Sequence, residues 1–310
     1  MKLCSPLAAL LLLGGSADAL SDYQTGQALY QQGRFASAVH EWYADAERGE
    51  PKAQFALGMM FERGRGVRKD MEEAHKWYRL AAENNFPDAQ IRLAQLYMVG
   101  ALDGGAQEGK KWYARAAAGG SALAQFMLGL LYLEGRGVES DEKQAAHWFE
   151  LAANQGYAPA QNNLGSFYQA GQGVEQNFTR AFELFQDAAR QGDARAQNNL
   201  GSLYAKGHGV DKNQAWAVFW FTLSAQQGNE VARKNIAASL PRLQRNLIAG
   251  SRVNIRSGAG TGYKRITRME KGDTVYVLGK GGGWTQIYFE QGNNFGLGWV
   301  ASRLLQGGAG

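Results

Sequence analysis

Cysteine is nearly missing from this sequence, because Cys4 is the only one among its 310 residues. It precedes the apolar run Leu7–Leu13, whereas the acylated cysteine of a lipoprotein would follow such a run. The mature chain therefore contains no thiol if the first residues are removed. That absence excludes disulfides, thiolate metal sites and cysteine nucleophiles.

Long apolar stretches are missing as well. The run Leu7–Leu13 is far shorter than the roughly 18–20 residues that a membrane-spanning helix needs, and no later segment is long enough. Lys2 before this run and Ala17-Asp18-Ala19 after it are typical of an export signal. We therefore expect residues 1–19 to be a signal peptide, no transmembrane span, and a periplasmic or secreted bacterial protein that is not a lipoprotein.

Patterns that carry catalysis or hold cofactors are equally scarce. The histidines fall in no metal-ligand spacing such as HExxH: His40, His75, His147 and His208. Residues 104–110 match the phosphate-loop pattern GxxxxGK, but Lys111 replaces the Ser or Thr that would reach magnesium, and no strand precedes them. No GxSxG elbow or dinucleotide fingerprint occurs. We expect no enzyme activity, no cofactor, no metal and no nucleic-acid partner.

Charge is balanced over most of the chain and concentrated at one end. Residues 20–248 carry 24 basic and 24 acidic side chains, whereas residues 249–310 carry eight basic and three acidic ones. The eight are Arg252, Arg256, Lys264, Arg265, Arg268, Lys271, Lys280 and Arg303, so the net charge of +5 lies entirely in this segment. A compact cationic module attracts anionic partners; a solubilising surface is the alternative.

One pattern recurs at nearly constant spacing and predicts a helical repeat. Its anchor alanine is followed by glutamine in the first five copies and recurs at spacings of 36, 35, 36, 36 and 36 residues: Ala53, Ala89, Ala124, Ala160, Ala196 and Ala232. A glycine or alanine follows five positions later. Leucine at Leu57, Leu93, Leu128, Leu164 and Leu200 continues an apolar stripe at helical spacing. These positions predict the first helix of each unit.

A glycine-bearing connection and a second helix complete each unit. Gly64-Arg65-Gly66 is one such connection, suited to a chain that leaves a helix with positive φ. The second helix carries an aromatic pair, as in Trp77-Tyr78, and an alanine or serine four residues after its first ring. We expect ring and alanine to pack together between neighbouring helices. Because neither helix buries its stripe alone, the units must stack into a solenoid.

These residues resemble the Sel-1-like repeat family, a relative of the tetratricopeptide repeats with a longer glycine-containing loop. Five copies cover residues 51–86, 87–120, 121–157, 158–193 and 194–229, after a tetratricopeptide-like unit at 20–50 and before a helical cap and linker at 230–249. In the second copy Leu102 replaces a loop glycine and one residue is deleted, which predicts a distorted loop near 99–107.

Two further features of the repeats carry structural predictions. The pairs Asn162-Asn163 and Asn198-Asn199 occupy identical positions in successive units, so we expect them to hydrogen-bond inside the stack. In the cap, the last apolar edge is expected to be covered by Ile236, Leu240, Leu243 and Leu247. Pro241 is expected in the first turn of a new helix.

From Gly250 the apolar pattern alternates, which predicts strands at 274–278, 284–289 and 295–300. Val253–Gly260, Gly283-Trp284 and Gly298-Trp299-Val300 resemble the bacterial Src-homology-3-like domain over residues 250–306. Ala259 stands where that family commonly has proline, and 291–295 form a longer hairpin tip. We expect 307–310 to be a disordered tail. The predicted fold is multidomain, an all-α helical-hairpin solenoid followed by a small all-β barrel.

The resemblance implies that the barrel binds peptidoglycan or its stem peptides. Rings beside basic side chains bind extended anionic polymers by stacking and charge. The candidate ligand-binding residues are Asn254, Arg256, Tyr263, Trp284, Tyr288, Phe295 and Trp299. For Trp284 and Trp299 the alternative is packing in the barrel core. Tyr263 and Phe295 lie in predicted loops, so we expect them to be free.

The predicted function is an exported, non-enzymatic scaffold or adaptor. Its solenoid binds a protein or peptide partner, and its cationic barrel binds peptidoglycan or another anionic envelope polymer. One alternative is a periplasmic regulator of protein–protein contacts without wall binding, and a remote one is an accessory cell-wall hydrolase activity. The identity of the partner depends on exposed side chains that differ between repeats.

Overall fold

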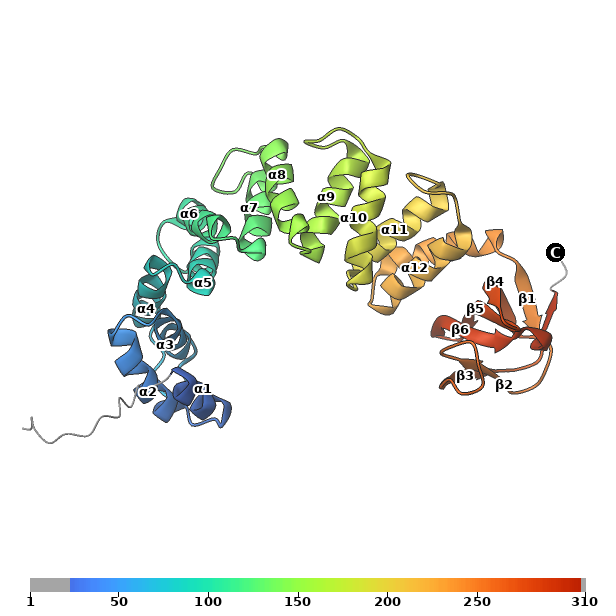
Figure 1. The fold of residues 1–310 in the computed structure, drawn as a ribbon, viewed down its shortest axis with the longest axis horizontal. Helices are drawn as coiled ribbons and strands as arrows, with labels where there is room; N and C mark the ends of the chain where they lie inside the picture. The colour runs from blue at the N-terminus through green and yellow to red at the C-terminus, as the bar shows by residue number, and fades with distance from the viewer. Residues whose placement is uncertain (1–22, 308–310) are drawn as a thin grey trace, which may run out of the picture. The chain divides into compact units, whose positions relative to one another are not determined.

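The computed structural model describes residues 23–307 (Figure 1). The predicted signal peptide at 1–19 and residues 308–310 of the predicted tail lie outside the described residues. The chain divides into two compact units, one ending at Leu96 and the other beginning at Tyr97. Helices fill the first unit, and the second contains further helices and then a β-sheet.

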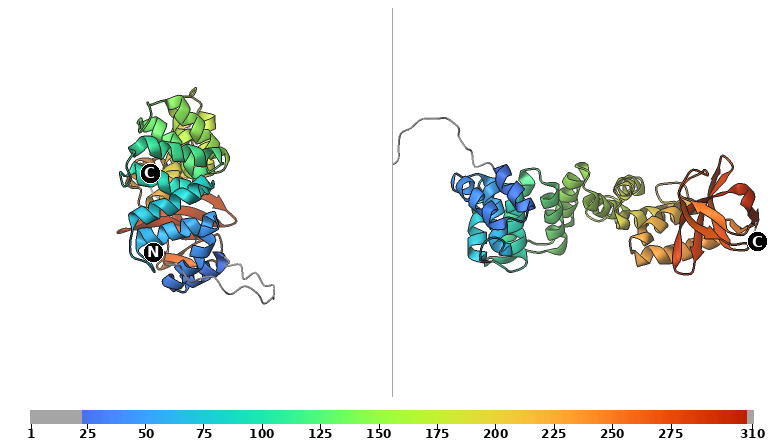
Figure 2. Two further views of the ribbon diagram at one scale, coloured as in Figure 1. Left: turned by 90° about the vertical axis from the view of Figure 1, so that its left-hand side faces the viewer. Right: turned by 90° about the horizontal axis from the view of Figure 1, so that it is seen from below.

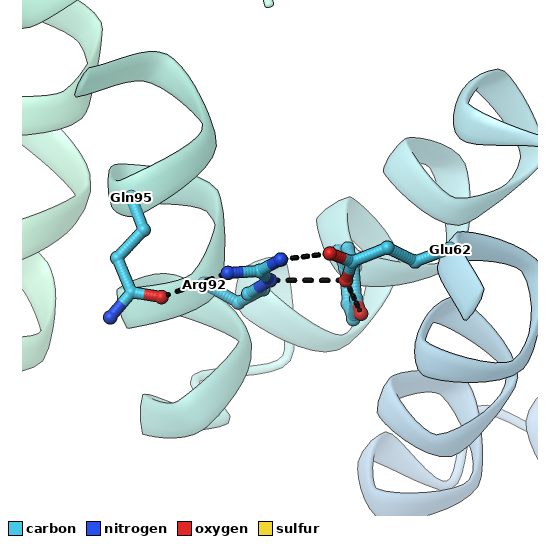
Figure 3. A network of polar contacts seen from close by, with 4 residues as sticks. Glu62, Arg92 and Gln95 are labelled. Atoms are coloured by element: carbon cyan, nitrogen blue, oxygen red, sulfur yellow. Dashed lines mark hydrogen bonds and ion pairs between the residues drawn. The ribbon is translucent and has the colours of Figure 1, made fainter. Parts of the chain in front are cut away.

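The first unit consists of α1 (Tyr23–Gln31), α2 (Phe35–Glu47), α3 (Pro51–Arg63), α4 (Met71–Glu83) and most of α5 (Pro87–Met98). Trp42 and Leu57 are buried in a cluster shared by α2 and α3. Glu62 of α3 accepts hydrogen bonds from Tyr78 of α4 (2.6 Å) and from Nε of Arg92 of α5 (3.1 Å). Figure 3 shows Arg92 held between Glu62 and Gln95. This network joins three successive helices.

The second unit continues the helical repeat. Its helices are α6 (Gly105–Ala118), α7 (Ala122–Glu134), α8 (Glu142–Asn154), α9 (Ala158–Ala170), α10 (Phe178–Arg190), α11 (Ala194–Lys206), α12 (Gln214–Gln226) and α13 (Glu230–Ser239). The connection 99–104 before α6 is one residue shorter than its counterpart at 135–141, and Gly104 in it has φ 122°. The predicted distortion is confirmed. The phosphate-loop match at 104–110 is the start of α6, with a helix and no strand before it.

Side-chain caps and glycines set the helix ends. Asp141, Asn177 and Asn213 precede second helices of the repeats and accept hydrogen bonds from main-chain N–H groups of the first turn. The first loop glycine ends the first helix in the left-handed region, with φ 79° at Gly207. The second glycine of the loop lies against the preceding repeat. A Cβ on Gly209 would come 2.3 Å from the carbonyl oxygen of Phe178, so no larger residue fits there.

Ring packing within the repeats involves a glycine as well as the predicted alanine. The second ring of the aromatic pair is the fully buried one; Phe149 and Phe185 share core clusters with the helix-two alanines Ala152 and Ala188, and each also packs on a glycine of the first helix. A Cβ on Gly129 would come 2.5 Å from the Phe149 ring, and one on Gly165 would come 2.8 Å from the Phe185 ring. The missing Cβ lets the two helices approach closely, so the glycine five residues after the anchor determines where the ring lies.

Buried amides join successive repeats. The asparagine prediction is confirmed: Asn199 Nδ2 donates to Asn162 Oδ1 at 3.0 Å, and Asn235 Nδ2 donates to Asn198 Oδ1 at 2.9 Å. A second ladder uses the glutamine that follows each anchor alanine. At its end, the second helix of a repeat carries another glutamine, whose Nε2 donates to this one at 2.8–2.9 Å. The pairs are Gln155 with Gln125, Gln191 with Gln161, and Gln227 with Gln197. Each amide inside the stack thereby has a partner.

The C-terminal module is a seven-stranded antiparallel sheet in the order β3-β2-β6-β5-β4-β1-β7. The strands are β1 (Arg245–Ile248), β2 (Val253–Arg256), β3 (Arg265–Met269), β4 (Thr274–Gly281), β5 (Trp284–Gln291), β6 (Asn294–Ala301) and β7 (Leu305–Gly307). Its core contains Ile255, Val275, Ile287, Phe289 and Val300. The three predicted strands are confirmed, and each is longer than predicted.

The prediction for Pro241 is confirmed in a short form, because this proline lies in the first turn of a new 3-10 helix, η1 (Leu240–Arg242). Three other predictions at the edges of this module are wrong. Leu247 lies in β1, so the sheet begins inside the segment 230–249 that was predicted to be cap and linker. Phe295 lies in β6 and not in a loop, and Gly307 pairs with Asn246 in β7 and is not part of the tail. In each case pairing with a neighbouring strand or packing against the cap decides the structure.

Candidate binding surface

Six of the seven predicted site residues lie on one face of the sheet. Successive side chains of a strand point to opposite faces, and the register places Arg256 and Gln286 opposite Trp299, Tyr288 opposite Leu297, and Glu290 opposite Phe295. The other face carries the barrel core. We call the first face the outer face; its candidates are Asn254, Arg256, Trp284, Tyr288, Phe295 and Trp299.

The helical cap covers one half of the outer face. Tyr288 is 0% exposed and shares a buried cluster with Phe221 of α12 and Ile236 of α13. Tyr276, Leu278 and Leu297 pack at the edge of the same cluster. The sheet, red in Figure 2, thus lies next to the last helices of the second unit and buries their apolar side chains. Because this half is occupied by the chain itself, the prediction that Tyr288 binds a ligand is wrong.

Phe295 is also taken up by the contact with the cap. The Arg233 guanidinium of α13 lies 3.8 Å from the centroid of the Phe295 ring and 3.6 Å from Oε1 of Glu290. Tyr288 donates a hydrogen bond to the same carboxylate. Burial, aided by this hydrogen bond, raises the pKa of Tyr288 well above its usual value. Sequence reasoning missed Arg233, because nothing in α13 marks it as a partner of the barrel.

The other half of the outer face is open. Asn254, Arg256, Trp284 and Trp299 are each half-buried. Neither tryptophan belongs to the core cluster, so the alternative that these rings fill the barrel core is wrong. Tyr263 lies beside this half in the loop after β2. It is 55% exposed, its carbonyl oxygen accepts a 2.8 Å hydrogen bond from Arg256, and its ring lies on Gly258.

Unpaired positive charge surrounds the open half. Among residues 23–307, none of the eight basic side chains from Arg252 to Arg303 forms an ion pair within 4.0 Å. The acidic side chain of the barrel that does form an ion pair, Glu290, pairs with Arg233 of α13. Arg268 of the edge strand β3 is exposed and donates a 3.2 Å hydrogen bond to Asn254. Arg265 and Ile266 are exposed on the same strand. Charge without an internal partner acts on ligands in solution.

The sequence analysis missed an exposed ring next to this surface. Trp216 of α12 is 47% exposed and lines a pocket of about 160 Å³ together with Phe219 and Gln286. Its counterparts in the two preceding repeats are polar, Gln144 and Arg180. That replacement of a polar surface position by tryptophan in the last repeat was the signal that could have found it.

The described residues contain neither a membrane-spanning helix nor a cluster of metal ligands. Within 23–307 every helix is too short or too polar to cross a bilayer. No three His, Cys, Asp or Glu side chains in that range gather into a possible metal site. His208, the histidine nearest to the barrel in sequence, packs against Phe178 with the rings tilted by 43° and 4.6 Å between their centroids.

The sequence matches the family model of the Sel1 repeat five times, at residues 51–86, 87–121, 122–157, 158–193 and 194–229. The boundary after residue 121 falls one residue later than predicted. The model of the bacterial SH3 domain matches residues 251–306. These two matches cover the helical repeats and most of the sheet.

Two solved structures resemble the repeat region. A Sel1 repeat protein from Oxalobacter formigenes is 33% identical with a TM-score of 0.63, and the match covers 71% of this chain and 88% of that one. A protective antigen present in uropathogenic Escherichia coli strains is 31% identical with a TM-score of 0.67, over 72% of this chain and 50% of that one.

Two curated fungal proteins match a short part of the chain. The chitin synthase regulatory factor 3 of Schizosaccharomyces pombe is 48% identical over 48 residues, and a chitin synthase regulator of Saccharomyces cerevisiae is 54% identical over 39 residues. The matches cover 16% and 13% of this chain. The chain spans only 5% and 6% of the length of these relatives.

Proposed function

Because the chain belongs to the Sel1 repeat family and ends in a bacterial SH3 domain, we propose that it is an exported, non-catalytic adaptor. Its solenoid binds a protein or peptide partner. Its barrel binds peptidoglycan or another anionic polymer of the cell envelope, through the open half of the outer face. The sequence pattern of residues 1–19 supports export.

Binding of the polymer by the barrel is supported by unpaired positive charge beside rings that are at least partly exposed. Arg256, Arg265 and Arg268 have no carboxylate partner within the barrel, and Trp284, Trp299 and Tyr263 lie beside them. Rings stack on the apolar faces of sugars and peptides, whereas guanidinium groups pair with carboxylates. A polymer of sugars and acidic peptides offers both kinds of group along an extended chain.

The contact between the cap and the barrel leaves one side of the barrel free to bind the polymer. Since Tyr288 and Phe295 are held against α12 and α13, the polymer contacts Asn254, Arg256 and Trp299 instead. The repeats stay available for a second partner, because the cap closes only their last apolar edge. The two activities in one chain make an adaptor.

Cosedimentation with purified peptidoglycan tests the barrel's part. We expect the wild-type protein to pellet with the polymer, and R265Q/R268Q to lose most of this binding, by about tenfold or more in affinity if two phosphate- or carboxylate-type contacts are removed. The matched control is R195Q/K234Q, which removes two exposed charges from the solenoid. Binding that both variants retain equally would contradict a specific contact at β3.

Two other outcomes would point to the alternatives. If the wild-type protein does not pellet and its cellular complexes survive muramidase digestion, it is a protein–protein regulator without wall binding. Turnover of wall polymer by the purified protein would instead indicate a hydrolase. Each result contradicts the proposal in a different way.

A further inference from the structure

A positively charged pocket lies in the solenoid, and no residue of the barrel lines it. It has a volume of about 440 Å³ and lies where α11, the connection 207–213, α13 and η1 meet. Its polar lining includes Lys206, His208, Lys212, Asn235, Ser239 and Arg242. Phe221 contributes an apolar wall. No acidic side chain lines this pocket.

The three cations of the pocket lack acidic partners. Lys206, Lys212 and Arg242 are exposed, and none forms an ion pair with any residue between 23 and 307. Asp211 precedes Lys212 in the chain but does not line the pocket. Three cations converging without a counter-ion create a positive potential that a bound anion lowers.

Two successive cations at one repeat position occur at the end of the repeat array. Lys206 and Arg242 occupy the same repeat position, ten residues after the anchors Ala196 and Ala232. In the four preceding repeats that position holds Arg63, Val99, Glu134 and Ala170. The requirements of the fold are therefore met without a cation here, and the pair is available for binding.

A hydroxyl group adds to the polar lining of the pocket. Ser239 is 3% exposed, lines the pocket and makes no side-chain cap hydrogen bond to η1. The serines Ser202 and Ser224, by contrast, each donate to a main-chain carbonyl. The Ser239 hydroxyl is therefore a donor for a ligand oxygen in the pocket.

A row of amides leads to the pocket and indicates what kind of molecule carries the anion. Asn163, Asn199 and Asn235 are half-buried at the same position of α9, α11 and α13, and Asn235 itself lines the pocket. Amide side chains offer a donor and an acceptor, the groups that pair with a peptide main chain. The apolar Phe221 beside them suits the stem of a long acidic side chain.

We propose that this pocket binds the carboxylates of an acidic peptide segment whose main chain follows the asparagine row. The proposal rests on the proposed function, because it names the chemistry of the peptide that the solenoid receives. Lys206, Lys212 and Arg242 pair with the carboxylates, and Ser239 donates a hydrogen bond to one of them. It assigns the end of the solenoid, and not the barrel, as the site that selects this partner.

The test uses the full chain and a fluorescent deca-glutamate peptide as the probe, with deca-glutamine as its neutral counterpart. We expect K206Q/R242Q to weaken binding of deca-glutamate by about tenfold or more, since it removes two charge-assisted contacts with the peptide carboxylates. We expect S239A to weaken it a few-fold. The matched control K52Q/K234Q removes two exposed lysines that do not line the pocket, and it should bind like the wild type.

The barrel variant R265Q/R268Q separates this proposal from the previous one. It should still bind deca-glutamate through the pocket even if it no longer pellets with peptidoglycan. The proposal is overturned if K206Q/R242Q binds as tightly as the wild type, if R265Q/R268Q abolishes binding, or if deca-glutamine binds equally well. Inorganic phosphate that binds this pocket while deca-glutamate does not would replace the peptide by a phosphate-bearing ligand, which also contradicts it.

Discussion

The Phe221 ring of α12 lies directly on Gly201 of α11, so closely that a Cβ on this glycine would come 2.7 Å from the ring. The same contact joins Phe185 to Gly165 and Phe149 to Gly129. Because the helices of a repeat approach each other across this glycine, ring and glycine together set the spacing within each unit of the stack.

Replacing Gly201 by alanine should therefore destabilise the repeats. The added methyl group has no space unless α11 and α12 separate, and overpacking of this kind costs about 1–3 kcal/mol. Thermal denaturation followed by circular dichroism at the helix band measures the loss. The control is G262A, at a glycine with a normal φ and no atom near its missing Cβ. Equal melting temperatures for G201A and the wild type would show that the helices are not closely packed here.

Removing both amides of one pair in the asparagine ladder should cost less than the sum of the two single removals. In N198A the amide of Asn235 loses its acceptor, and an unpaired half-buried amide costs about 1–3 kcal/mol. In N198A/N235A neither group remains to be satisfied. We expect the free energy of unfolding to fall by less in the double variant than the sum of the single losses. Strictly additive losses in urea denaturation would contradict a direct pair.

Alkaline pH should loosen the contact between the barrel and the cap. The raised pKa of Tyr288 means that the folded state binds its proton more tightly than the unfolded state does. The stabilisation is thus complete below about pH 10, the ordinary tyrosine value, and is lost as pH rises above it. Melting temperatures between pH 8 and pH 11 should fall more steeply for the wild type than for Y288F. Parallel curves would show that Tyr288 ionises like a free tyrosine.

Arg92 should be replaceable by lysine only in part. Its guanidinium donates through two nitrogens to Glu62 and through a third to Gln95, a geometry that one ammonium group does not reproduce (Figure 3). The Glu62 side chain is 17% exposed, so R92A leaves a mostly buried carboxylate unpaired. We expect R92A to destabilise the first unit by about 1–3 kcal/mol and R92K by less. E62Q/R92A should recover part of the loss in the same denaturation assay.

The repeat architecture could be predicted because its signal is periodic and local. The anchors from Ala53 to Ala232 recur at the repeat spacing, and the paired loop glycines recur in four of the five Sel1 repeats, so their positions indicated helices, loops and stacking together. The asparagine ladder followed from the same periodicity. The ring contact did not, because spacing along one helix does not tell which neighbouring helix a side chain meets.

The candidate site was predicted less completely, for a different reason. Alternation in the strands placed Trp284, Tyr288 and Trp299 on one face, but it carried no information on what covers that face. Arg233 and Ile236 come from a helix more than fifty residues before Tyr288, and they decide that this ring is buried. Lys206 and Arg242 were likewise unremarkable in the sequence until α11 and η1 brought them to one pocket.

The linear sequence determined which segments are helices and strands, how the units repeat and where the positive charge gathers, since each depends on residues close together in the chain. Tertiary structure alone decided which half of the sheet remains open and which cations share a pocket. Both depend on how the end of the solenoid packs. Its apolar side chains are buried against one half of the outer face of the sheet, so that half is not open to a ligand.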